Sequence, residues 1–240
     1  MDIQNQYNDW HTATETFFDN PMNFQWYQTV AKLLPDLNKL DVLEIGCGRG
    51  AFSHLVAKRF PGVKLTAVDI SEVAIEHAKK TPGSIAFSVD DAENLSFPDN
   101  SFDYVFSCET MEHLPHPEKL PKEIFRVLKP GGRFIITTEN YFNGMTMLWL
   151  KTWILKTPFD SGSGVQPLEN YFLFFGVANR IRRGGLKLSH TESNHFQWLA
   201  LPGFDPAKLC TSDFKNPFLK KLFKPFGRHY TFCGYKPESR

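Results

Sequence analysis

Three side chains that could do chemistry stand close together in the segment CETMEHLP, residues 108–115. Glu109, Glu112 and His113 are spaced at i, i+3 and i+4, so on a helical turn they share one face. Clustered carboxylates repel one another unless a positive group lies between them, and two carboxylates with an imidazole suit a divalent cation of the Mg, Mn or Zn kind. Without a metal, His113 is a candidate general base, because histidine exchanges protons near neutral pH. The structural alternative is that the Glu–His pair caps or orients this loop.

A second candidate is the glycine-rich segment VLEIGCGRG, residues 42–50, in which Gly46, Gly48 and Gly50 occupy every second position. Bare backbone lets a ligand approach the main chain without meeting a Cβ, and the free N–H groups of a following helix favour polar or anionic ligand groups. The G-x-G-x-G spacing differs from the G-x-G-x-x-G fingerprint of dinucleotide-binding proteins, which disfavours an NAD-dependent oxidoreductase. The structural alternative is an ordinary tight turn after a strand.

Acidic residues follow the next two predicted strands. Asp69 lies where it could accept hydrogen bonds from both hydroxyls of a ribose, and Asp91 lies where it could reach the exocyclic amine of an adenine. The alternative for Asp69 is to cap the helix that begins near Ser71, although Ser71 is itself the better capping residue. These loops meet the glycine turn only if the sheet is doubly wound, with the ligand outside the strand ends.

The elements that must position these residues are predicted between residues 40 and 138, where short apolar runs alternate with amphipathic stretches. This alternation is typical of a parallel sheet covered by helices on both faces. We predict strands over 41–45, 64–69, 85–89, 102–107 and 133–138. We predict helices over 51–60, 72–79 and 118–128, with Pro-Gly-Gly at 130–132 ending the last.

The composition of the chain disfavours several classes of function and location. The 240 residues carry 27 basic and 26 acidic side chains, a formal charge of +1, which disfavours a dedicated nucleic-acid partner. The basic charge is concentrated at the end, since residues 170–240 hold 12 basic and 4 acidic side chains. Four cysteines without close pairs favour a reducing compartment, and no apolar run of about eighteen residues is present. We therefore expect a cytoplasmic protein without a membrane span.

Taken in order, the segments 42–50, 68–71, 91–103 and 126–133 resemble those of the class I S-adenosylmethionine-dependent methyltransferases. The resemblance covers residues 40–138. It implies an α/β fold, a Rossmann-like doubly wound seven-stranded sheet with a helical cap insertion, and S-adenosyl-L-methionine as cofactor. Its implied cofactor residues fall into groups: Gly46, Gly48 and Gly50 along the methionine part; Asp69 at the ribose; Asp91 and Ala92 at the adenine; Cys108 beside the sulfonium; and Glu44, Cys47 and Ile70 nearby. The alternative for Cys108 is a small buried hydrophobe.

The resemblance also implies one domain in four parts. These are an N-terminal helical lid (1–38), a cofactor-binding core (40–138), a mostly helical cap insertion (139–198) and C-terminal strands (199–240). Within them we predict helices over 145–155 and 171–181, and the last two strands over 203–211 and 229–235.

The E-x-x-E-H string is similar to that of ubiquinone-biosynthesis O-methyltransferases. It is also similar to that of small-RNA 3′-end 2′-O-methyltransferases, in which the matching residues bind a divalent ion. The second group has a further histidine in an H-x-F-E-W-like stretch, which implies His195 of the segment NHFQW as a fourth metal ligand. The glutamate of that stretch is missing here, so the alternative for His195 is a packed or substrate-facing side chain, and His190 competes for the same role.

The resemblance leads us to expect O-methylation of a small aromatic, catechol-like or lipid-linked acceptor, assisted by a divalent cation that would chelate two oxygens of the acceptor. The alternatives are an RNA 3′-end 2′-O-methyltransferase and a catalytically silent protein that binds the cofactor and serves as a partner. The basic aromatic run at 214–226 predicts peripheral contact with an anionic membrane, or else a solvated face. Neither the acceptor nor the oligomeric state is predicted.

Overall fold

The computed structural model of the protein describes residues 2–14, 20–140, 166–170, 172–196 and 224–238, together with positions 153, 154, 156, 216, 218, 221 and 222. The side chains at 194–196 are outside the description. Most of the predicted helix over 145–155 and most of the basic run at 214–226 also lie outside the described residues. Within the described part of the chain, no helix is both long enough and apolar enough to cross a bilayer.

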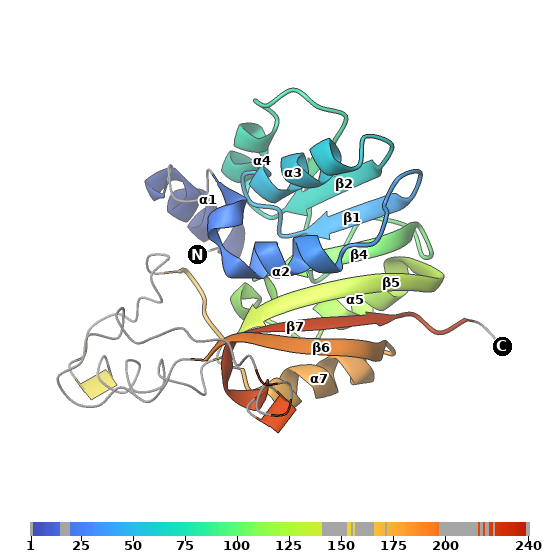
Figure 1. Ribbon diagram of the computed structural model, residues 1–240. Helices are drawn as coiled ribbons and strands as arrows, with labels where there is room; N and C mark the ends of the chain where they lie inside the picture. Colours follow the sequence, from blue (N-terminus) through green and yellow to red (C-terminus); the bar gives the residue numbers. More distant parts are fainter. Residues whose placement is uncertain are drawn as a thin grey trace.

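In the described part of the chain, seven strands form one sheet in the order β3-β2-β1-β4-β5-β7-β6 (Figure 1). Their bounds are β1 Asp41–Ile45, β2 Lys64–Asp69, β3 Ala86–Val89, β4 Phe102–Cys108, β5 Leu128–Glu139, β6 Lys187–Phe196 and β7 Gly227–Tyr235. Strands β1 to β5 are parallel, and β7 is antiparallel to both β5 and β6. Because the chain winds outward from β1 in both directions, the order reverses between β1 and β4, where α/β proteins bind ligands. The predicted doubly wound, seven-stranded sheet is confirmed.

Helices cover both faces of the sheet (Figure 1). Their bounds are α1 Ile3–Ala13, α2 Gln25–Leu33, α3 Ala51–Arg59, α4 Glu72–Ala78, α5 Leu120–Val127 and α7 Phe174–Arg183, with short 3₁₀ helices η1 Pro21–Asn23, η2 Met111–His113 and η4 Lys224–Phe226. The predicted ranges of β1 and β2 match these bounds to the residue. Strand β5 begins at Leu128, ahead of the predicted residue 133.

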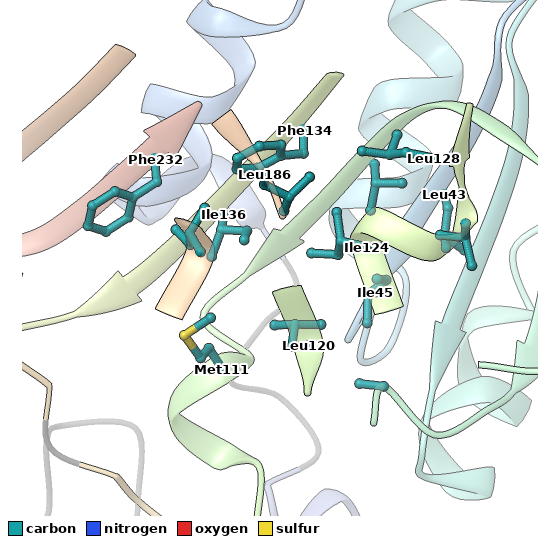
Figure 2. Packing of buried hydrophobic residues seen from close by; sticks show 14 of the residues in the cluster. Leu43, Ile45, Met111, Leu120, Ile124, Leu128, Phe134, Ile136, Leu186 and Phe232 are labelled. Carbon is teal, nitrogen blue, oxygen red and sulfur yellow. The ribbon is translucent and has the colours of Figure 1, made fainter. Parts of the chain in front are cut away.

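Successive residues of the central strands pack on opposite faces, which fixes the two layers of the core. Val42 joins the cluster beneath α2 and α3, whereas Leu43 joins the cluster beneath α5 and α7. Figure 2 shows the second cluster, in which Leu120 and Ile124 of α5 lie against Leu43 and Ile45 of β1. A sheet buried on both faces needs apolar residues at nearly every position, and this requirement makes its strands recognisable in the sequence.

The predicted position of the sixth strand is wrong. Residues 203–211, where we predicted it, lie outside the described residues, and Lys187–Phe196 forms β6 instead. This segment falls within the predicted cap insertion at 139–198. Among the described strands, β6 lies at the edge of the sheet and bonds only to β7, so it can carry the polar sequence KLSHTESNHF, which lacks the apolar run of a central strand.

Candidate active site

The turn after β1 lies at the carboxyl edge of the sheet and has glycine, which has no Cβ, at every second position. Gly46, Gly48 and Gly50 have φ values of 75°, 51° and 77°, a region that residues with a side chain rarely adopt. A Cβ on Gly46 would overlap Thr110, lying 2.6 Å from its Cγ2. The N–H of Gly46 also donates to the carbonyl of Val68 on β2, at 2.8 Å. Glycine is therefore required here both by backbone conformation and, at Gly46, by crowding.

Asp69 ends β2 and holds two loops in place. Its Oδ2 accepts a hydrogen bond from the N–H of Gly48 at 2.8 Å, and its Oδ1 accepts one from the N–H of Ser71 at 2.9 Å. The hydroxyl of Ser71 accepts from the N–H of Ala74, so Ser71 is the N-cap of α4, as expected. Because each carboxylate oxygen has a second lone pair, Asp69 can still accept hydrogen bonds from a diol.

Helix α1 lies beside the carboxyl ends of the parallel strands (Figure 1) and is tied to the loops there. The hydroxyl of Tyr7 donates to the carbonyl of His113 at 3.2 Å. The side-chain oxygen of Asn8 accepts from the hydroxyl of Ser71 at 2.8 Å. The guanidinium of Arg49 donates to the carbonyl of His11. Helix α1 thus joins the glycine loop, the start of α4 and the E-x-x-E-H segment, as a lid over this edge would.

These elements surround a pocket of about 430 Å³, a usual size for a small-molecule site. Its wall includes these residues predicted from the sequence: Gly46, Cys47, Gly48, Asp69, Ile70, Asp91, Ala92, Cys108, Glu109, Glu112 and His113. Of the predicted cofactor residues, Glu44 and Gly50 do not line it. The side chain of His195 lies outside the described residues. The wall also contains residues that the sequence analysis did not assign to a site, among them His11, Glu139, Gln166 and Glu169.

Glu44 lies behind the glycine loop, in the core. Its side chain is buried, and its Oε2 accepts a hydrogen bond from the hydroxyl of Ser53 on α3. Burial raises the pKa of Glu44 to about 8, and the nearby charge of Asp69 acts in the same direction. The geometry gives Glu44 a structural contact that joins β1 to α3.

The raised pKa of Glu44 predicts a pH dependence of stability that Glu44→Gln should reduce. An acid whose pKa is higher in the folded protein contributes stability that is fully present below its unfolded pKa and is lost as pH rises through the folded value. For Glu44 this window runs from the ordinary glutamate range up to about 8. Glutamine cannot ionise and keeps an oxygen for Ser53. Between about pH 5 and about pH 8, the free energy of unfolding measured with urea should fall less steeply in Glu44→Gln than in the wild type. The exposed Glu118→Gln is the control, and equal slopes for Glu44→Gln and the wild type would contradict the assignment.

The E-x-x-E-H segment does not place its three side chains on one face, because Glu109 has a left-handed φ of 51° and a 3₁₀ helix follows at Met111–His113. Glu109 approaches β7, with its Oε2 3.4 Å from Nδ1 of His229. Glu112 Oε2 accepts from the hydroxyl of Thr138 at 2.9 Å. Nδ1 of His113 lies 2.9 Å from the carbonyl oxygen of Leu168. The predicted ligand set of Glu109, Glu112 and His113 is therefore not brought together as one group.

A different group converges instead. In the part of the chain that the structure describes, Glu109, Glu139 and His229 each offer one potential ligand atom, and these atoms lie within 4.8 Å of one another. Glu139 and His229 are direct partners in the register of β5 and β7. Burial lowers the pKa of His229 to about 4, so its imidazole is neutral at pH 7. Burial, and then the charge of Glu139, raises the pKa of Glu109 to about 8.

Comparison with known proteins finds similarity to one kind of enzyme domain. Residues 43–136 match a family model described as a methyltransferase domain. Over 102 residues the chain is 42% identical to 2-methyl-6-phytyl-1,4-hydroquinone methyltransferase of Synechocystis sp., which covers 41% of this chain and 32% of that protein. Over 147 residues it is 30% identical to demethylmenaquinone methyltransferase of Thermotoga maritima, covering 59% and 63% respectively. Residues 43–136 therefore match a methyltransferase domain, and the chain is similar to S-adenosylmethionine-dependent methyltransferases of class I.

The fold of the chain agrees with this similarity. Phosphoethanolamine N-methyltransferase 2 of Haemonchus contortus, solved in complex with S-adenosyl-L-methionine, superposes with a TM-score of 0.67 at 21% identity. The superposition covers 99% of this chain and 60% of that one. The sequence matches cover less than two thirds of the length of either named relative. Those two relatives are named for 2-methyl-6-phytyl-1,4-hydroquinone and demethylmenaquinone, and a third, of Rickettsia bellii, is named a ubiquinone/menaquinone biosynthesis C-methyltransferase. These names support the predicted nearness to ubiquinone-biosynthesis methyltransferases, and none of the three names an O-methyltransferase.

Proposed function

We propose that the protein transfers the methyl group of S-adenosylmethionine to an oxygen atom of a small-molecule acceptor. One observation carries this proposal: a single pocket joins the glycine loop and Asp69 to His113 and a group of carboxylates. A methyl-transferring enzyme needs a cofactor-binding region and acid–base groups in the same cavity. The aromatic side chains of Tyr7, Trp26 and Tyr27 on the same wall favour an aromatic or lipid-linked acceptor.

The residues present fit the cofactor. The backbone of Gly48 is open, since a Cβ there would have the His11 ring carbon as its nearest contact at 3.7 Å. In the proposed arrangement the methionine part follows Gly46 to Gly48, the ribose hydroxyls bond to Asp69, and the adenine lies beside Asp91 and Ala92. When bound, S-adenosylmethionine supplies a methyl group on a positively charged sulfur and leaves as a neutral thioether. The protein's main contribution is then to orient the acceptor, which can lower the barrier by about 7 to 11 kcal/mol.

His113 is the proposed general base. A carbonyl oxygen can only accept a hydrogen bond, so Nδ1 of His113 must donate to Leu168. Within the described residues no hydrogen bond is formed by Nε2, which therefore keeps a lone pair. Because His113 lines the pocket, Nε2 can take the proton of an acceptor hydroxyl as that oxygen attacks the methyl carbon.

His113→Asn tests this role. The amide N–H of asparagine lies near the position of Nδ1, so the variant keeps a donor for Leu168 but loses the base. We expect the kcat of methyl transfer to fall by about 100-fold, with the Kd for S-adenosylmethionine unchanged. The acceptor would first be found by mass spectrometry of phenols, catechols, amines and carbon acids incubated with labelled donor and enzyme.

The control is His190→Asn, on the exposed edge strand β6. A wild-type kcat in His113→Asn would contradict the proposed base. Products methylated only on nitrogen or carbon would contradict transfer to oxygen while leaving the cofactor site intact.

A further inference from the structure

The carboxyl end of β5 and the beginning of β7 bring two potential metal ligands face to face. Glu139 and His229 are opposite residues in the antiparallel register, and Glu109 reaches them from the loop after β4. The ligand atoms of the three residues lie within 4.8 Å of one another. The group is buried, since the side chains of Glu109, Glu139 and His229 are 13%, 10% and 4% exposed.

Two buried carboxylate oxygens beside this group have no hydrogen-bond donor among the described residues. They are Oε1 of Glu109 and Oε1 of Glu112, and Glu112 is only 1% exposed. Glu109 and Glu112 line the same pocket. A buried carboxylate oxygen without a donor is costly and calls for an explanation, of which a missing ion is one.

If the acids of this group are all ionised, the charges around it do not balance within the described residues. Three carboxylates, those of Glu109, Glu112 and Glu139, gather here. Arg228 pairs with Glu139, its Nη2 lying 3.3 Å from Oε1. Thr138 gives Glu112 a neutral hydrogen bond. In their ionised form the three acids exceed this one guanidinium by two negative charges, which matches the charge of a divalent cation.

We propose that Glu109, Glu139 and His229 bind a divalent cation of the Mn²⁺ or Zn²⁺ class in the wall of the pocket. Two carboxylate oxygens and one imidazole nitrogen are a mixed ligand set that these ions accept, whereas Mg²⁺ and Ca²⁺ prefer oxygen alone. Three protein ligands leave an open coordination position, as in catalytic zinc sites. Glu109 and Glu139 line the pocket, so an ion held by them would lie at its wall. The ligand set differs from the predicted one, because Glu112 and His113 are not part of it.

The role of the ion rests on the proposed function, whereas the site itself does not. On that function, the ion would bind the acceptor oxygen, favour its deprotonation and fix its direction. The binding test below uses neither donor nor acceptor. A failure of methyl transfer would therefore leave the metal site standing, and a failure to bind metal would leave transfer by His113 standing.

The test is titration of the full-length, chelator-treated protein with MnCl₂, followed by electron paramagnetic resonance, and with ZnCl₂ by calorimetry. We expect one saturable site. Glu139→Gln and His229→Gln should each weaken binding by at least about tenfold. The matched controls Glu118→Gln and His190→Gln, both exposed, should bind as the wild type does. His113→Asn should also retain binding, which separates this site from the predicted E-x-x-E-H site.

Circular dichroism and thermal unfolding would establish that each variant is folded, and Glu109→Gln replaces either ligand variant that fails to fold. The proposal is overturned if neither ion binds saturably, in which case protons neutralise the carboxylates. It is also overturned if Glu139→Gln and His229→Gln retain full affinity, or if His113→Asn abolishes binding.

Discussion

Asp69→Ala should weaken the binding of S-adenosylmethionine by at least about 100-fold. A hydrogen bond to a charged acceptor contributes roughly 1.5 to 3 kcal/mol, and the proposed arrangement places two ribose hydroxyls on this carboxylate. The substitution also removes the acceptors for the N–H groups of Gly48 and Ser71, which Asp69 holds at 2.8 and 2.9 Å. The glycine loop and the ribose site are therefore lost together.

Isothermal titration calorimetry measures this loss directly. Asp69→Asn is the matched variant, because its amide oxygen can still accept a hydrogen bond from one loop while the charge is gone. Its affinity for S-adenosylmethionine should lie between that of the wild type and that of Asp69→Ala. Folding of both variants is checked by circular dichroism. A folded Asp69→Ala protein that binds the donor as tightly as the wild type would contradict the assignment of the ribose site.

Gly46→Ala should lower the free energy of unfolding by more than about 2 kcal/mol, because two penalties add at this position. The φ of 75° is unfavourable for any residue with a Cβ. The new Cβ would also overlap Thr110, whose hydroxyl lies 3.2 Å from the carbonyl oxygens of both Ile45 and Cys108 and so cannot move away freely. Urea unfolding followed by circular dichroism measures the change.

Gly48→Ala separates the two penalties. Its φ of 51° imposes a similar backbone cost, but the nearest atom to an added Cβ is 3.7 Å away. The loss for Gly48→Ala should therefore be smaller, about 1 to 2 kcal/mol. Thr110→Ala introduced into Gly46→Ala should restore part of the lost stability. Equal losses for the two glycine variants, with no recovery in the double variant, would show that crowding by Thr110 plays no part.

Much of the fold could be predicted because its central strands are buried on both faces. β1 and β2 are short apolar runs that end in a glycine turn and an acidic residue, so their limits are visible in the sequence. Strand β6 could not be recognised in this way. It lies at the sheet edge and needs apolar residues on one face at most, and its partner β7 is the last of the described strands in the sequence.

The residues of the candidate site differ in the same way, since some can be recognised from the local sequence and others cannot. The glycine loop and Asp69 carry local signals, since conformation and spacing within a few residues define them. The pairing of Glu139 with His229 depends on the register of two strands about ninety residues apart in the sequence, which no local pattern specifies. The spacing of Glu109, Glu112 and His113 was also a poor guide, because it assumes a continuous helix, whereas Glu109 has a left-handed φ and precedes the 3₁₀ helix Met111–His113.

The most direct test of the account is a crystal structure of the protein with S-adenosylhomocysteine. We predict that the ribose hydroxyls lie within hydrogen-bond distance of the Asp69 carboxylate, with the adenine beside Asp91 and Ala92 and the sulfur on the side of the pocket that holds Cys108. A nucleoside bound elsewhere, or one whose ribose faces away from Asp69, would contradict the proposed cofactor site.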